Sequence, residues 1–266
     1  MMWIILAGIF GLLIGSFANV VAYRVPAGIS LLRPSQCPQC STPIRPWQNI
    51  PVLSWLLLRG RCASCSAPIP VRYPVVETVT AAMFAGLAWY LPAIGLTAPV
   101  SVIAWIAYAW FAASSVVLVL IDVDTRRLPD VVVLPSLAVG LVAFLLAWPL
   151  GADGGALLRA VIAMIAMFGS YALIRFIRPD GMGGGDVKLA AVAGLYLGWL
   201  GWGALVVGWL GGFVVGGLVG LVMIATKRAS RSSAVAFGPW LLVGTWIGIL
   251  VGNVVGQQYL VWCGLA

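Results

Sequence analysis

Long apolar runs recur along the whole chain and constrain its fold more than any other feature. Each is about long enough to cross a hydrocarbon core of roughly 30 Å as a helix. With 62% hydrophobic and 8% charged residues, the sequence predicts an all-α polytopic membrane protein with about eight transmembrane helices. The runs lie near residues 1–23, 74–91, 99–121, 131–149, 155–177, 187–202, 203–225 and 238–260.

Basic residues indicate which side of the membrane each loop occupies. If the N-terminus lies outside and all eight runs cross, fourteen of the fifteen Lys and Arg residues share one side, with Arg159 alone on the other. By the positive-inside rule the shared side is the cytoplasm. Six of the seven acidic residues fall there too, Asp153 being the exception. The net charge of +8 then reflects topology and contact with anionic lipid, so no nucleic-acid partner is predicted.

A polar segment of about fifty residues separates the first two runs, and it contains two CxxC pairs. The two pairs are separated by 21 residues, slightly more than is usual for a zinc ribbon, and two such pairs are a strong signal for a four-thiolate zinc site. Two disulfides are the alternative, but cytoplasmic thiols stay reduced. We predict a structural zinc ion, because four thiolates leave no open position for a catalytic water. Its ligands are Cys37, Cys40, Cys62 and Cys65.

These features divide the chain into three parts: a first transmembrane helix over residues 1–23, a cytoplasmic zinc-binding domain over 24–73 and a seven-helix membrane domain over 74–266. We expect the first run to be a retained helix, because no basic residue precedes it and no small-residue cleavage pattern is evident. Glycines at a spacing of four over 208–220 and 244–256 predict close helix packing within the bundle.

The chain contains no histidine, which excludes Ser-His, Cys-His and histidine-metal mechanisms. Acid–base chemistry therefore falls chiefly to seven acidic residues. Asp122 directly follows the apolar run 116–121, and Asp186 opens the run that begins at residue 187. A carboxylate beside hydrocarbon is costly and is by default a candidate for function. Two such groups in contact cannot both ionise easily, so the pair can activate a water and protonate a leaving amine, as in aspartic proteases.

Three alternatives remain open from the residues alone. Asp122 and Asp186 can be separate helix-terminal residues that never meet, the chain can be an ion-coupled transporter that uses both, or it can be a non-enzymatic zinc-clamped assembly platform. No convincing inverted repeat supports transport, and both acids are predicted at one face. Gly183, Gly184 and Gly185 precede Asp186, and we expect them to permit positive φ angles and close backbone approach.

A set of ordered motifs adds a family resemblance. They are Gly15-Ser16-Phe17-Ala18-Asn19-Val20 with Tyr23-Arg24, the two CxxC pairs around residues 45–51, Arg72-Tyr73-Pro74-Val75-Val76-Glu77, Ile121-Asp122 through Leu128-Pro129-Asp130, Gly183-Gly184-Gly185-Asp186, and Phe237-Gly238-Pro239. Over nearly its full length the chain resembles the type IV prepilin peptidases, membrane aspartic proteases that process type IV pilins and the pseudopilins of type II secretion.

The resemblance implies a bifunctional enzyme of the bacterial inner membrane, with its active site facing the cytoplasm. It implies that Asp122 and Asp186 are the catalytic aspartates and that the four cysteines bind zinc. The implied substrate is a prepilin or pseudopilin, cleaved after a glycine and then methylated at its new N-terminus from S-adenosylmethionine. No motif identifies a methyl-donor site, and the oligomeric state is not predicted.

Overall fold

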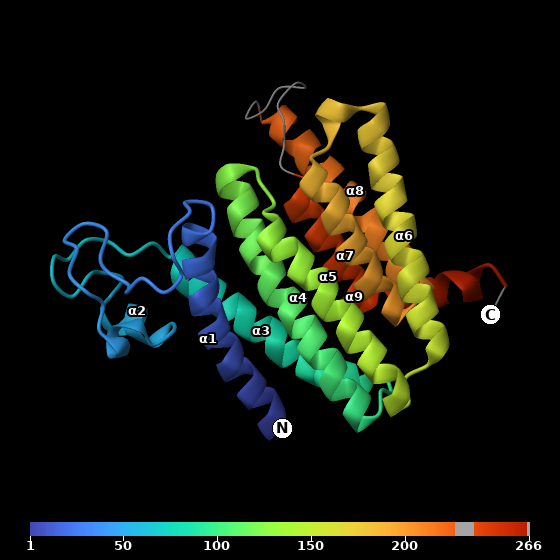
Figure 1. The fold of residues 1–266 in the computed structure, drawn as a ribbon, viewed down its shortest axis with the longest axis horizontal. Coiled ribbons are helices and arrows are strands. Elements are labelled where there is room, and N and C mark those ends of the chain that lie inside the picture. The colour runs from blue at the N-terminus through green and yellow to red at the C-terminus, as the bar shows by residue number, and fades with distance from the viewer. Residues whose placement is uncertain (227–236, 265–266) are drawn as a thin grey trace. The chain divides into compact units, whose positions relative to one another are not determined.

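The computed structural model describes residues 1–226 and 237–264 and shows a helical protein (Figure 1). β pairing in these ranges is limited to two isolated bridges. Each of the eight apolar runs forms a helix, as predicted, and seven of these helices are long and apolar enough to cross a membrane. The remaining helix, α7 (Gly184–Leu200), has 17 residues. At 1.5 Å per residue it is about 25 Å long, shorter than the others.

Contacts along the chain define two compact units, which we describe separately. The first contains residues 1–95 and 109–121, and the second contains 96–108 and 122–266. Helix α4 (Ala98–Thr125) contributes to both units. The three-part division drawn from the sequence rests on polarity instead of contacts, and it stays a prediction.

In the first unit, α1 (Met2–Arg24) packs along α3 (Arg72–Ala93). A Cβ atom on Gly11 would lie 2.7 Å from the Cα atom of Ala81, and one on Gly15 would lie 2.7 Å from the Cα atom of Glu77. Glycine at these two positions therefore lets the two backbones approach closely, as small residues do in membrane helix pairs.

The two cysteine pairs lie between α1 and α3, each in the same kind of turn. The Cys37 N–H donates to the Thr42 carbonyl at 3.0 Å, and the Cys62 N–H donates to the Ala67 carbonyl at 2.8 Å. Both turns have the sequence Cys-x-x-Cys-Ser-x-Pro-Ile, so equal local sequences give equal local structures. Between them lie a 3-10 turn, η1 (Pro46–Asn49), and the short helix α2 (Leu53–Leu57).

Two buried polar side chains attach this segment to the helix pair, and a third, Asn19, joins the two helices. Glu77 of α3 accepts a hydrogen bond from the Val52 N–H at 2.6 Å. Asn19 of α1 donates to the Tyr73 carbonyl at 3.4 Å. Arg24, at the end of α1, donates to backbone carbonyls of Ser30, Leu31 and Arg33. Glu77 and Arg24 thus satisfy backbone groups that the irregular segment leaves unpaired.

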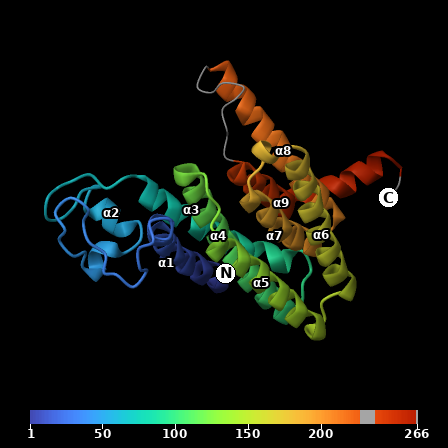
Figure 2. The same ribbon diagram turned by 45° about the horizontal axis from the view of Figure 1, so that its top comes forward.

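In the second unit, α7 lies at the centre (Figures 1 and 2). Every residue from Leu189 to Trp199 is buried, so this helix has no exposed face over three turns. A helix that is apolar on all sides belongs in the interior of a bundle. It packs chiefly against α5 (Asp130–Ala147), α6 (Gly154–Ile177), α8 (Trp202–Ala225) and α9 (Gly238–Trp262), and Tyr108 of α4 donates a hydrogen bond to its Tyr196 carbonyl at 2.6 Å.

Two polar side chains satisfy the carboxyl end of α7. Arg159 of α6 donates to the carbonyls of Gly198 at 2.7 Å and Trp199 at 3.0 Å. Asn253 of α9 donates to the Leu200 carbonyl and accepts from the Ala204 N–H. These bonds mark the break between the sixth and seventh apolar runs. They also give Arg159, the one basic residue predicted on the far side of the membrane, a partner at a helix C-terminus.

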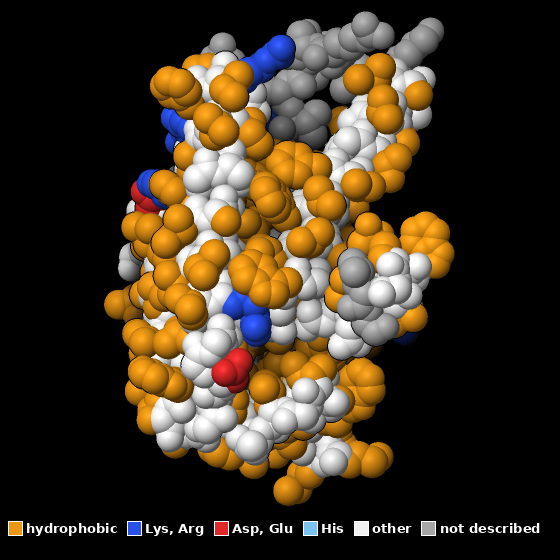
Figure 3. All heavy atoms as spheres, turned by 90° about the vertical axis from the view of Figure 1, so that its right-hand side faces the viewer, with side chains coloured by type: hydrophobic (Ala, Val, Ile, Leu, Met, Phe, Trp, Pro, Cys, Tyr) orange, Lys and Arg blue, Asp and Glu red, His pale blue; other side chains and the backbone are white. Residues whose placement is uncertain are grey.

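The outer surface of the second unit is largely hydrophobic, as the face shown in Figure 3 illustrates. Helix α6 exposes apolar side chains at helical spacing, among them Leu158, Ile162, Ile165 and Phe168. A soluble protein rarely exposes such a continuous apolar surface. Together with the span lengths, this surface confirms the prediction of a polytopic membrane protein.

Glycines form the seam between α8 and α9. A Cβ atom on Gly248 would lie 2.5 Å from the Ala204 carbonyl oxygen and 2.6 Å from the Cα atom of Gly208, and Gly244 is in similar contact with Gly212. The prediction that the glycines spaced by four over 208–220 and 244–256 pack helices closely within the protein is therefore confirmed at most of these positions. Gly220 is different, because a Cβ there would meet no described atom within 4 Å.

This seam predicts the outcome of a matched pair of substitutions. Gly248→Ala should destabilise the protein by about 1–3 kcal/mol, because the added methyl group overlaps the backbone of α8. Gly217→Ala should be neutral or slightly stabilising, because its Cβ faces open space in the middle of a helix. Thermal unfolding in detergent measures both changes, and equal melting temperatures for the two variants would contradict the packing described.

Candidate active site

Asp122 lies near the carboxyl end of α4, where the helix gives way to a turn. Arg126 adopts a left-handed conformation with φ of 54°, and its N–H closes the helix on the Asp122 carbonyl at 2.8 Å. The Asp122 side chain is only 4% exposed. Its carboxylate accepts a hydrogen bond from the Gly238 backbone N–H, while its Oδ2 atom has no partner. One of its oxygens is therefore buried and unsatisfied.

Asp186 lies in the first turn of α7 and is 9% exposed. Its Oδ2 atom accepts a hydrogen bond from the Gly183 N–H at 3.1 Å, so the side chain reaches back to cap its own helix. The positive end of the helix dipole favours a carboxylate here. Its Oδ1 atom is buried and has no partner, as is the Oδ2 atom of Asp122.

The glycines before Asp186 matter for their lack of a side chain and not for unusual φ angles. None of Gly181, Gly183, Gly184 and Gly185 has a positive φ, so that part of the expectation was wrong. Instead, these glycines allow neighbouring atoms to approach the backbone closely. A Cβ atom on Gly183 would lie 2.9 Å from Asp186 Oδ2, and a Cβ atom on Gly185 would lie 2.7 Å from Leu128 Cβ. At Gly184 it would lie 2.5 Å from Arg175 Nη1, which places this guanidinium beside the amino end of α7.

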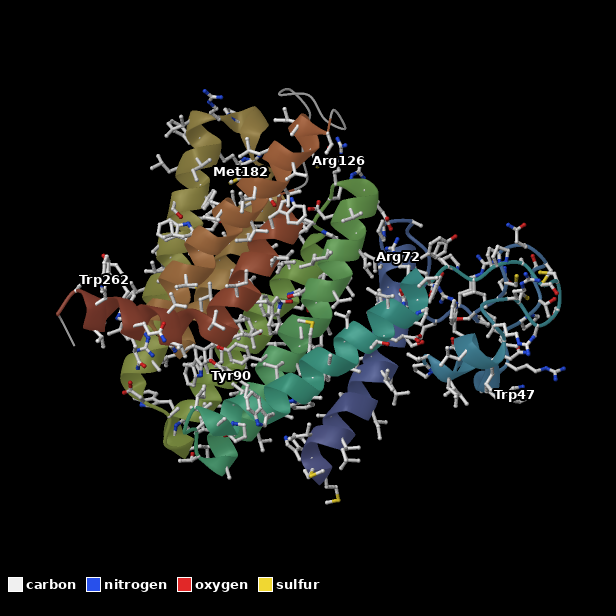
Figure 4. All side chains as sticks on the ribbon, turned by 180° about the vertical axis from the view of Figure 1, so that it is seen from behind. Trp47, Arg72, Tyr90, Arg126, Met182 and Trp262 are labelled. Carbon is white, nitrogen blue, oxygen red and sulfur yellow. The ribbon has the colours of Figure 1, made fainter. Side chains whose placement is uncertain are left out.

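Leu128 joins the two aspartate environments. Its side chain contacts the position of Gly185, next to Asp186, and also that of Gly238, whose Cβ would lie 2.7 Å from Asp122 Oδ2. The two carboxylates interact electrostatically. Figure 4 shows Arg126 and Met182, each four residues from one of the aspartates, at the same end of the second unit and away from Trp262. The structure therefore brings Asp122 and Asp186 together.

The other acidic side chains described have different roles. Asp130 forms an exposed ion pair with Lys188, with Nζ to Oδ2 at 2.7 Å. Asp153 caps α6 by accepting from the Gly155 N–H at 2.9 Å, and Asp124 is exposed. Glu77 is buried, but it bonds Val52 within the first unit. A pair of buried carboxylates with unpaired oxygens is found at Asp122 and Asp186.

Tyr171 is a third buried polar group at this site, and the sequence reading did not single it out. It lies on α6, is fully buried, and its hydroxyl has no hydrogen-bond partner. The phenol interacts electrostatically with Asp186. A tyrosine inside an apolar run is normally interpreted as a core residue. Only the packing register of α6 against α7 shows that Tyr171 lies near Asp186.

The four cysteines predicted as ligands cluster in the first unit. Their sulfur atoms all lie within 4.8 Å of one another, and Cys37 Sγ is 3.8 Å from Cys65 Sγ. A tetrahedral site with metal–sulfur bonds of about 2.3 Å needs sulfur atoms roughly 3.8 Å apart. All four are free thiols, and hydrogen bonding with the Thr42 side chain and backbone lowers the pKa of Cys40 to about 6. The cluster is thus arranged to hold one metal ion.

Comparisons with known proteins give the same picture over most of the chain. Residues 9–91 match the bacterial peptidase A24 N-terminal domain, and residues 109–224 match the type IV leader peptidase family. No solved structure matches the chain.

Several relatives called prepilin leader peptidase/N-methyltransferase align nearly end to end. The one from Pseudomonas aeruginosa is 35% identical, covering 96% of this chain and 93% of the relative. The one from Neisseria gonorrhoeae is 37% identical, covering 91% and 88%. Identity at this level over this length is decisive for membership, so the chain belongs to the type IV leader peptidase family.

Proposed function

We propose that this protein cleaves the leader peptide from type IV prepilins or pseudopilins at the cytoplasmic face of the bacterial inner membrane. The observation that carries the proposal is the convergence of two buried carboxylates, Asp122 and Asp186, each fixed by one backbone N–H and each retaining an unpaired oxygen. The absence of histidine from the chain excludes the common alternative bases.

The chemistry assigns one proton to the pair. Two carboxylates held together in a dry site share a proton, so one is ionised and the other is neutral. The ionised group takes a proton from water as the water oxygen attacks the scissile carbonyl carbon, and the neutral group gives its proton to the carbonyl oxygen. The C–N bond of the tetrahedral intermediate then breaks: the neutral acid gives its proton to the leaving amine, and one hydroxyl of the intermediate gives its proton to the ionised carboxylate, so the pair again holds one proton.

The location of the pair suits a substrate that is partly embedded in the membrane. Both aspartates lie at helix ends, next to the apolar bundle, to the loop that carries Arg126 and Arg127, and to the last turn of α6, which carries Arg175. By the positive-inside rule this end of the helices faces the cytoplasm. A prepilin with a basic leader in the cytoplasm and an apolar helix in the bilayer would then bring its scissile bond to this level.

The metal at the cysteine cluster is proposed to be zinc, held by Cys37, Cys40, Cys62 and Cys65. Soft thiolates in a tetrahedral arrangement select zinc. A four-thiolate ion supplies no open coordination position, so its contribution is to clamp the two turns together. The segment has few buried residues of its own, and the metal takes the place of a hydrophobic core.

Methylation of the new N-terminus is the second proposed activity. It is supported by the names of the relatives, which are called prepilin leader peptidase/N-methyltransferase. S-adenosylmethionine is the methyl donor that this activity implies, and we assign no residue of this chain to its binding.

The acid pair predicts the result of removing either carboxylate. Asp122→Asn or Asp186→Asn should lower cleavage of a purified prepilin by about 10²-fold or more, because general acid–base catalysis is lost. Asp124→Asn is the matched control: the residue lies two positions from Asp122 but is exposed, so it should cost much less. Mass spectrometry of the prepilin N-terminus measures both cleavage and the addition of a methyl group.

The melting temperatures of the two Asn variants separate a loss of catalysis from a loss of folding. Neither Asn variant should unfold more easily than the unmodified protein, because each replaces a buried carboxylate that has an unpaired oxygen. Normal cleavage by either Asn variant would refute the aspartic mechanism.

The cysteine cluster predicts the metal content. Protein purified without chelators should carry about one zinc ion per chain, and replacing any one of the four cysteines with Ser should release it. Cys263→Ser is the control, because this exposed cysteine lies far along the chain from the cluster. Elemental analysis provides the measurement, and protein that contains no metal in any preparation would rule out the site.

A further inference from the structure

Tyr171 is held beside Asp186 by the register of the α6–α7 pair. A Cβ atom on Gly198 would lie 2.8 Å from the Cα atom of Ala160, and one on Gly194 would lie 2.9 Å from the Cα atom of Met164. The two helices are therefore antiparallel and in close contact. Continuing the same register toward the amino end of α7 brings Asp186 opposite the turn of α6 that holds Tyr171.

Aromatic contacts connect Tyr171 to the surroundings of Asp122 as well. Its ring centroid is 6.0 Å from that of Phe237 and 5.4 Å from that of Phe213. Phe237 directly precedes Gly238, whose backbone N–H bonds the Asp122 carboxylate. Tyr171 thus lies beside Asp186 and also contacts the residue that directly precedes Gly238.

Three buried oxygens without partners belong to this one place: Asp122 Oδ2, Asp186 Oδ1 and the Tyr171 hydroxyl. Buried polar atoms in folded proteins nearly always have a partner, and a cluster of exceptions indicates a site for another molecule. The two nearby backbone donors, the N–H groups of Gly183 and Gly238, are already used by the carboxylates. The phenol O–H is the buried donor in this cluster that has no acceptor.

We propose that the Tyr171 hydroxyl is a third catalytic group, which donates a hydrogen bond to the scissile carbonyl oxygen of the substrate. This inference rests on the proposed peptidase function. As water attacks the carbonyl carbon, negative charge develops on that oxygen, and the O–H···O bond strengthens. Tyr171 keeps its proton throughout, because the proton that finally reaches the oxygen comes from the neutral aspartic acid. Its role is that of an oxyanion-hole donor in a water-excluded site.

The test is Tyr171→Phe, which removes one oxygen and keeps the ring. Loss of a single oxyanion donor costs about 10²–10³-fold in kcat, so kcat for a purified prepilin should fall by about that factor with KM little changed. The melting temperature should stay the same or rise, because the hydroxyl has no partner in the folded protein. Binding of prepilin to an Asp122→Asn, Tyr171→Phe double variant should match its binding to Asp122→Asn alone.

Tyr196→Phe is the matched control. Tyr196 is also fully buried and lies on α7, but its hydroxyl donates to the Ser136 carbonyl at 3.1 Å. Removing this oxygen should lower the melting temperature and leave kcat unchanged. The two phenylalanine variants therefore have opposite expected effects on stability and on catalysis.

Three outcomes would overturn the role of Tyr171: a kcat within threefold of the unmodified enzyme, a rise in KM at constant kcat, or a fall in kcat that follows a lower melting temperature. The Asp122→Asn variant in the same assay separates this inference from the function it rests on. If Asp122→Asn is inactive while Tyr171→Phe cleaves normally, only the role of Tyr171 fails. If Asp122→Asn cleaves normally, the aspartic mechanism itself is wrong.

Discussion

The burial of α7 on every side is the constraint on which the second unit depends. The backbone groups at the ends of a helix have no partner within the helix, so a helix packed among others needs side chains and turns to satisfy them. At the carboxyl end, Arg159 and Asn253 supply the missing donors. At the amino end, Asp186 accepts from Gly183 and at the same time brings a carboxylate to the edge of the apolar bundle. The same side chain is thus both a helix cap and a candidate for chemistry.

The arrangement of side chains around the amino end of α7 is not one that stability requires. Two carboxylates and a phenol lie buried together, and each has an oxygen without a partner. Each unsatisfied buried group costs about 1–3 kcal/mol, and keeping one of two neighbouring carboxylates ionised in a buried site adds to the cost. Close packing of Leu128 against Gly185 and Gly238 holds the groups in place despite that cost. Local instability maintained by tight packing is typical of sites selected for function.

The sequence predicted most of the secondary structure because hydrophobic run length is a strong signal, and all eight runs became helices. It also predicted the cysteine cluster, because CxxC spacing carries the geometry of metal binding. It could not show that Asp122 and Asp186 meet, since residues 64 positions apart come together only through helix packing. Positive φ angles at the glycines were expected and not found, because a glycine can serve either conformation or close approach, and the sequence does not distinguish them. Tyr171 was missed because a tyrosine inside an apolar run gives no sign that its hydroxyl lacks a partner.

The polar residues in the motifs that carry the family resemblance separate into two groups once their contacts are known. Asp122 and Asp186 each have an unpaired oxygen. The side chains of Asn19, Arg24 and Glu77 form hydrogen bonds with backbone groups of the first unit. Glu77 is the informative case, because it is a buried acid in a helix long enough to cross a membrane and would otherwise rank beside the two aspartates. Its carboxylate holds the N–H of Val52, a β-branched residue whose φ of 60° is strained, so its task is to fix an awkward turn in the cysteine segment. Burial alone therefore does not identify a catalytic carboxylate, whereas burial together with an unsatisfied oxygen does.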